Sequence, residues 1–187
     1  MDRALAIALL SRYVKDDHLV KHCLATGAVL KALAAHWGDD ESRWETIGIL
    51  HDNDYELVEG DMQQHGSRGA ELLLEHGVMP DIAEIIKRHN HFLHNDAYEQ
   101  RVEIALHAAD SVSGLVIACA LVKGGQLTLV TAKTVSKKAK ERSFAAGCDR
   151  NRIALIQPLM DLTTFYDIAI QGLLGIREEI REELGLT

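Results

Sequence analysis

Apolar residues recur along most of the chain at intervals of three or four positions, the spacing that lines one face of a helix. Only Pro80 and Pro158 interrupt it, and Ala, Leu and Glu, which favour helices, are frequent. Alternation typical of a strand is weak and confined to about residues 126–131, after Gly124-Gly125. The pattern predicts an all-α, single-domain protein over residues 1–187. Its core covers about residues 16–122, and a helical extension covers about 123–187.

Seven helices are expected from the places where the apolar runs begin and end. Acidic residues precede several runs and suit the start of a helix, whereas Gly38, Gly77 and Gly185 are placed to end one. Pro80 suits the first position of a helix. The expected helices span about residues 2–14, 16–37, 40–51, 65–76, 80–89, 100–122 and 163–184.

Residues 104–122 form the one stretch that raises the question of a membrane span. Asp110 is its only formal charge, but His107, Ser111, Ser113 and Gly114 also lie in it, and no second such stretch exists. A buried central helix is therefore the prediction, with no membrane association.

Composition and charge indicate which partners and which cellular compartment to expect. The chain has 47% hydrophobic and 26% charged residues and a net charge of -8, so no nucleic-acid polymer is expected as a partner. Cys23, Cys119 and Cys148 form no C-x-x-C pair and read as reduced thiols of a cytoplasmic protein. The apolar run at residues 4–10 lacks a cleavage pattern, so no signal peptide is expected.

The histidines gather in one part of the chain, since all ten lie between positions 18 and 107. His51-Asp52 follows an apolar run, and His22 and Asp110 lie on the apolar faces of their expected helices. A carboxylate buried in so apolar a helix as residues 100–122 needs a cation beside it. These four residues predict a divalent-metal site for Mn, Fe, Co, Ni, Zn or Mg.

Two further histidines extend the predicted site to two ions. His65 is expected on the apolar side of a helix start, with Gly69 leaving room beside it, and His89 at the core-facing end of the next helix. Asp52 would be free to bridge the two ions. Such a pair can clamp a phosphoryl group and activate water near neutral pH.

The order His22, His51-Asp52, Asp110 resembles the HD superfamily of metal-dependent phosphohydrolases. The segment His65-Gly-Ser-Arg-Gly69 is similar to the H-x-x-x-G element of its HDIG and HD-GYP branches, whose His binds a second metal. Segment Arg88-His-Asn-His91 resembles their next ligand element, although Asn90 stands where HD-GYP proteins have a second His, and His18 stands where they have an acid. Together with Ser143-Phe-Ala-Ala-Gly147, these elements resemble small stand-alone HD-domain proteins.

This resemblance implies an HD-domain helical bundle with extra C-terminal helices and the metal ligands given above. His18 and His91 are further candidate ligands, and His36, His76, His94 and His107 are expected to be structural or solvated. Asp54 and Glu56 are candidates to orient a water as general acid or base beside catalytic Asp52. The candidate contacts to a substrate phosphate are Arg68, Lys137, Lys138 and Arg142.

Three functions follow from this set. The first is hydrolysis of a phosphomonoester or phosphodiester, on a small nucleotide-like substrate, by metal-activated water. The second is an HD-fold di-iron oxygenase, because the ligand set also resembles the one that such oxygenases use. The third is a non-catalytic regulatory domain in which the metal is a structural pin.

Overall fold

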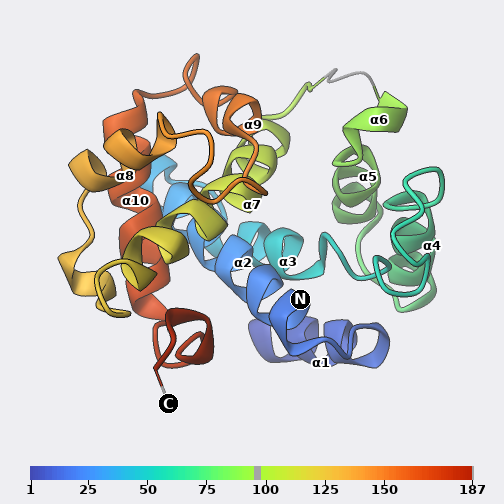
Figure 1. The fold of residues 1–187 in the computed structure, drawn as a ribbon. Coiled ribbons are helices and arrows are strands. Elements are labelled where there is room, and N and C mark those ends of the chain that lie inside the picture. Colours follow the sequence, from blue (N-terminus) through green and yellow to red (C-terminus); the bar gives the residue numbers. More distant parts are fainter. Residues whose placement is uncertain (95–97, 187) are drawn as a thin grey trace.

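The computed structural model describes residues 1–94 and 98–186, and every regular element within them is a helix (Figure 1). The predicted all-α fold class is therefore confirmed. The α-helices are α1 (Arg3–Tyr13), α2 (Asp17–Trp37), α3 (Glu41–Leu50), α4 (Ser67–Glu75), α5 (Pro80–Arg88), α6 (His91–His94), α7 (Arg101–Leu121), α8 (Ala132–Ala139), α9 (Arg150–Ala154) and α10 (Leu162–Gly175). Two short 3-10 helices, η1 (Leu127–Leu129) and η2 (Glu182–Leu184), complete them.

The early helices begin and end where their capping residues predict. Asp2, Asp16 and Asp40 each accept a backbone N–H bond at the start of α1, α2 and α3. Gly38 ends α2 in the left-handed conformation, with φ of 72°, and two backbone bonds close the helix there. Pro80 occupies the first turn of α5.

Helices α2 and α3 cross at two glycines. A Cβ atom built on Gly48 would lie 2.6 Å from the Cα atom of Gly27, closer than real side chains come. A Cβ atom on Gly27 would lie 2.8 Å from a side-chain carbon of Ile49. Because neither position carries a side chain, the two backbones touch, and the C-terminal end of α3 is held beside the middle of α2.

Helix α7 is the centre of the molecule, with α2, α8, α9 and α10 packed around it (Figure 1). It is long and apolar enough to cross a membrane, but 67% of its most apolar window is buried inside the molecule. Its apolar residues join one continuous hydrophobic core with those of α2, α3, α5 and α10. This burial agrees with the predicted central helix.

The weak strand expected at residues 126–131 is wrong. The segment contains η1 instead, and the N–H of Val130 bonds to the carbonyl of Leu127 within the same turn. A strand needs a neighbour to complete its hydrogen bonds, and the described residues offer none.

The expected helix at about residues 163–184 is also too long. Helix α10 ends at Gly175, and turns lead from there to η2, which is capped by Gly185 with φ of 68°. This break lets Ile180 and Leu184 turn inward and become buried, where η2 contacts α7. Burial of two apolar side chains outweighs continuation of a charged helix into solvent.

Candidate metal centre

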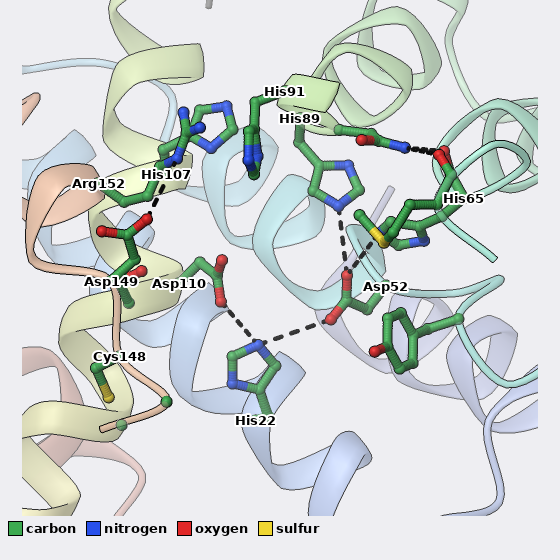
Figure 2. A pocket seen from close by; sticks show the side chains of 16 residues that line it. His22, Asp52, His65, His89, His91, His107, Asp110, Cys148, Asp149 and Arg152 are labelled. Carbon is green, nitrogen blue, oxygen red and sulfur yellow. Dashed lines mark hydrogen bonds and ion pairs between the residues drawn. The ribbon is translucent and has the colours of Figure 1, made fainter. Parts of the chain in front are cut away.

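Three helices bring the first predicted ligands together. Helix α2 carries His22 and α7 carries Asp110, and both point toward Asp52 (Figure 2). His51 and Asp52 directly follow the end of α3. The Nε2 atom of His22 lies 3.0 Å from Oδ1 of Asp110 and 3.8 Å from Oδ2 of Asp52. The Nε2 atom of His51 lies 3.3 Å from that same Oδ2 and 4.0 Å from Oδ1 of Asp110.

The other two predicted histidines meet the opposite oxygen of Asp52. The Nε2 atoms of His65 and His89 each lie 3.4 Å from Oδ1 of Asp52. Two groups therefore share this carboxylate, His22-His51-Asp52 and Asp52-His65-His89, and within each group the ligand atoms lie within 4.8 Å of one another. Each group could hold a metal ion.

Three of the histidines are oriented by a bond at the far side of the ring. Nδ1 of His51 donates to the carbonyl of Gly48 over 2.8 Å, and Nδ1 of His89 donates to the carbonyl of Ile86. His65 Nδ1 lies 2.8 Å from Oδ1 of Asp54. With the proton on Nδ1 in a neutral ring, each Nε2 presents a lone pair toward Asp52, as a metal-binding histidine must.

His65 does not start a helix as expected. It precedes α4 and is separated from it by Gly66, whose φ of 79° is left-handed. The turn at Gly66 allows Asp54 to accept the backbone N–H groups of Gly66 (2.8 Å) and Gly69 (2.7 Å) with its second oxygen. A Cβ atom on Gly69 would lie 2.4 Å from the side-chain oxygen of Asn53, so the glycine is required for this approach.

The chemistry of the donors fits a divalent ion at each group. Nδ1 of His51 carries the ring proton, so its Nε2 lone pair faces an Asp52 oxygen, and neither atom can donate to the other. Within the described part of the chain, Nε2 of buried His51 has no hydrogen-bond partner. Nitrogen and oxygen ligands bound about 2.1 Å from one ion lie about 2.9–3.4 Å apart. Most of the contacts to Asp52 fall in this range.

In the metal-free centre, the carboxylates raise the pKa values of two histidines, and the histidines lower the pKa of Asp52. Burial opposes the charged form of His22, but the bond to Asp110 outweighs it and raises the pKa of His22 to about 9. Burial is likewise outweighed at His65, whose pKa rises to about 9 beside Asp52 and Asp54. The surrounding histidines hold the pKa of Asp52 well below its usual range, despite burial. Positive charge therefore gathers around Asp52.

The centre forms part of the lining of a pocket of about 400 Å³ (Figure 2). His22, Asp52, His65, His89 and Asp110 line it from α2, α5, α7 and the loop before α4. Residues from the C-terminal extension contribute the remaining side, namely Gly147, Cys148, Asp149 and Arg152. A pocket of this size takes a small molecule and leaves the ligand atoms within its reach.

The two further candidate ligands lie outside both groups. His18 is exposed over 83% of its side chain and contacts Glu183. His91 lines the pocket, but its ring packs against Phe92, with ring centroids 4.1 Å apart. Asn90, at the position of a second His in the resembled element, instead donates to the backbone carbonyls of Met62 and His65. It therefore ties the His65 loop to α5.

The two acids considered for proton transfer have other partners. Asp54 is fully buried, and its oxygens are taken up by His65, Gly66 and Gly69 as described above. It therefore orients a ligand and does not face a substrate. Glu56 accepts the backbone N–H groups of Lys15 and Asp16 at the turn before α2. These contacts argue against the predicted acid–base role for both residues.

The four cations predicted to contact a phosphate lie away from the pocket lining. Arg68 pairs with Glu71 over 2.8 Å, and Lys138 pairs with Glu141 over 2.7 Å. Lys137 is exposed, and exposed Arg142 lines a different pocket. The pocket cation is Arg152, which belongs to the same basic segment but was not singled out. The sequence signal that could have selected Arg152 is its place in the first turn of a helix that begins after the capping residue Asp149.

Comparison with known proteins gives one family. The family model described as HD domain matches residues 19–115, which is more than half of the chain. No curated protein and no solved structure gave a significant match. The five residues of the two ligand groups fall inside the matched range together with Asp110, whereas Arg152 lies beyond it.

Proposed function

Because the chain belongs to the HD domain family, a superfamily of metal-dependent phosphohydrolases, we propose that it hydrolyses a phosphomonoester or phosphodiester of a small, nucleotide-like molecule. The observation that supports the proposal most directly is the position of the Asp52 carboxylate between two groups of histidines. Its two oxygens face two separate histidine pairs at the wall of a pocket of about 400 Å³. Two divalent ions there would supply positive charge to the phosphoryl oxygens and lower the pKa of water.

The protein's own side chains hold the geometry that such chemistry needs. His22, His51 and Asp110 would bind one ion and His65 and His89 the other, with Asp52 common to both. Bonds from the far ring nitrogens to Gly48, Ile86 and Asp54 fix three of these histidines before any ligand arrives. This preorganisation supports a catalytic centre, because a group already in place costs nothing to orient during the reaction.

The test is a metal-dependent phosphatase assay. The purified protein is analysed for bound elements and stripped. It is then reloaded with Mn, Mg, Fe, Co, Ni or Zn and assayed on p-nitrophenyl phosphate, bis(p-nitrophenyl) phosphate and nucleoside monophosphates. Asp52→Asn should lose both bound ions and reduce turnover by at least about 100-fold. Asp167→Asn, an exposed change on α10, is the matched control and should leave both unchanged.

Three results would overturn the proposal. The first is full turnover and metal content in Asp52→Asn. The second is a lack of hydrolysis with every ion, combined with dioxygen consumption by anaerobically iron-loaded protein, which would establish the oxygenase instead. The third is a folded protein with no turnover of any kind, which would leave a binding domain.

A further inference from the structure

One wall of the pocket is built differently from the metal centre. We call the set His91, His107, Asp149 and Arg152 the distal wall, and in Figure 2 it lies away from Asp52 and His65. Among the described residues that line the pocket, Arg152 is the one lysine or arginine. Only 12% of its side chain is exposed, so its guanidinium group is placed at the pocket and not in bulk solvent.

Two contacts among the described residues help to position the guanidinium group of Arg152. Nη1 donates to the hydroxyl oxygen of Tyr98 over 2.8 Å, and Nε lies 4.0 Å from Oδ2 of Asp149. Asp149 is itself fixed, because its other oxygen caps α9 by accepting the N–H of Asn151 over 2.8 Å. A planar group held in this way presents its donors in a set direction.

Within the distal wall, the charges of Arg152 and Asp149 offset each other. The positive charge of Arg152 faces the negative charge of Asp149. Burial, together with His89 and Arg152, lowers the pKa of His107 to about 3, so its ring is neutral. Nε2 of His107 has no hydrogen-bond partner in the described structure, although the residue is only 4% exposed. A polar ligand group would give it one after a small ring rotation.

From these observations we propose that Arg152 is a substrate-positioning residue, and that the distal wall selects phosphate esters whose alcohol part is uncharged and rich in hydrogen-bond acceptors. A second anionic group would meet Asp149 and find no net positive charge. An apolar group would leave the donors of the distal wall without water. The inference rests on the proposed function, because the metals must hold the phosphate for the alcohol part to reach this wall.

The experiment uses three esters with the same number of carbons. Glucose 6-phosphate is uncharged beyond its phosphate, 6-phosphogluconate adds a carboxylate, and hexyl phosphate is apolar. The wild-type protein should prefer glucose 6-phosphate to each of the others by about tenfold in kcat/KM. Arg152→Met should raise KM for glucose 6-phosphate by about tenfold, with kcat unchanged and hexyl phosphate unaffected. Arg177→Met, an exposed change elsewhere, is the matched control.

Tyr98→Phe is the second variant, because it removes the hydroxyl group that accepts a bond from Arg152 and keeps the ring. It should raise the same KM by a smaller factor, which keeps the proposal testable if Arg152→Met folds poorly. An equal effect of Arg152→Met on all three esters, or a preference for 6-phosphogluconate, would overturn the proposal.

Direct binding separates this inference from the proposed function. The three esters are titrated calorimetrically into protein loaded with calcium. A ranking of affinities that Arg152→Met abolishes supports the distal wall even if no ester is hydrolysed. Hydrolysis without any such ranking leaves the phosphohydrolase standing and removes the role of Arg152.

Discussion

At the scale of single residues, Asp54 shows how a buried carboxylate can serve a metal site that it does not enter. Its contacts to His65, Gly66 and Gly69 join a ring nitrogen to two backbone N–H groups of one loop. The carboxylate thereby fixes the His65 ring and the turn that carries it. A substitution at Asp54 should therefore change metal affinity by disturbing the orientation of the His65 ring.

Asp54→Asn tests this connection. One oxygen is replaced by an NH₂ group, so a donor will face either the loop N–H groups or the His65 ring. We expect affinity for the ion held by His65 and His89 to fall about 10- to 100-fold, with the other ion less affected. Manganese titration calorimetry measures both steps.

The matched control is Asp61→Asn, since Asp61 is exposed and bonds only within its own turn. Two unchanged binding steps in Asp54→Asn would show that His65 needs no orienting partner.

The sequence was sufficient to predict which His and Asp side chains come together around Asp52, but not the groups that orient them. His22, His89 and Asp110 lie on apolar helix faces, and helix geometry alone turns such positions inward. The role of Asp54 depends on where the backbone of Gly66 and Gly69 arrives, which periodicity does not encode. Which basic residue lines the pocket is not encoded locally either, because only tertiary packing distinguishes Arg142 from Arg152 within one basic segment.

At the scale of elements, the contact of Gly27 with Gly48 sets the distance between two ligand-bearing helices. His22 lies five residues before Gly27 on α2, and His51 follows Gly48 by one turn of α3. The rings of His22 and His51 lie with centroids 5.2 Å apart. Separation of the two helices would therefore open the first ligand group.

Gly48→Ala should force that separation. Its Cβ would need the space occupied by the backbone of Gly27, so we expect a loss of about 1–3 kcal/mol in the free energy of unfolding. Metal affinity should fall with it. Urea denaturation and a metal titration measure the two effects.

Gly175→Ala is the comparison, because nothing lies within 4 Å of a Cβ atom there. It should be neutral or mildly stabilising. Equal stability of Gly48→Ala and wild type would mean that the helix crossing adapts easily.

Helix boundaries were predictable wherever a local signal marks them. Asp16 and Gly38 delimit α2, and both act through the backbone immediately beside them. The boundary at Gly175 was missed because Ile180 and Leu184 continue a helical spacing, yet their burial against α7 requires the chain to turn. Local pattern and tertiary contact favour different structures there, and the contact prevails.

At the scale of the whole molecule, the metal centre couples folding to pH. In the absence of metal, His22 and His65 have pKa values raised from 6.5 to about 9. A raised folded-state pKa gives stability that is complete below pH 6.5 and is lost as pH rises toward 9. The metal-free protein should therefore unfold at lower urea concentration at pH 9 than at pH 6.5.

Divalent metal should reverse this trend, because ions and protons compete for the same nitrogens. The stabilisation on adding metal is thus expected to grow between pH 6.5 and pH 9. His36→Gln, an exposed change at the end of α2, should follow wild type. A metal-free protein equally stable at both pH values would contradict the predicted charge state of His22 and His65.

Because both candidate groups share Asp52, two ions bound there would not bind independently. The first ion withdraws negative charge from the carboxylate that the second needs, and two divalent ions about 3.5–4 Å apart repel each other. The second ion should then bind more weakly than the first. Because such coupling is reciprocal, each bound ion lowers the affinity of the centre for the other. Over the concentrations at which only the second ion exchanges, occupancy of the two-ion centre would follow the free-metal level of the surroundings, and so would any activity that needs both ions.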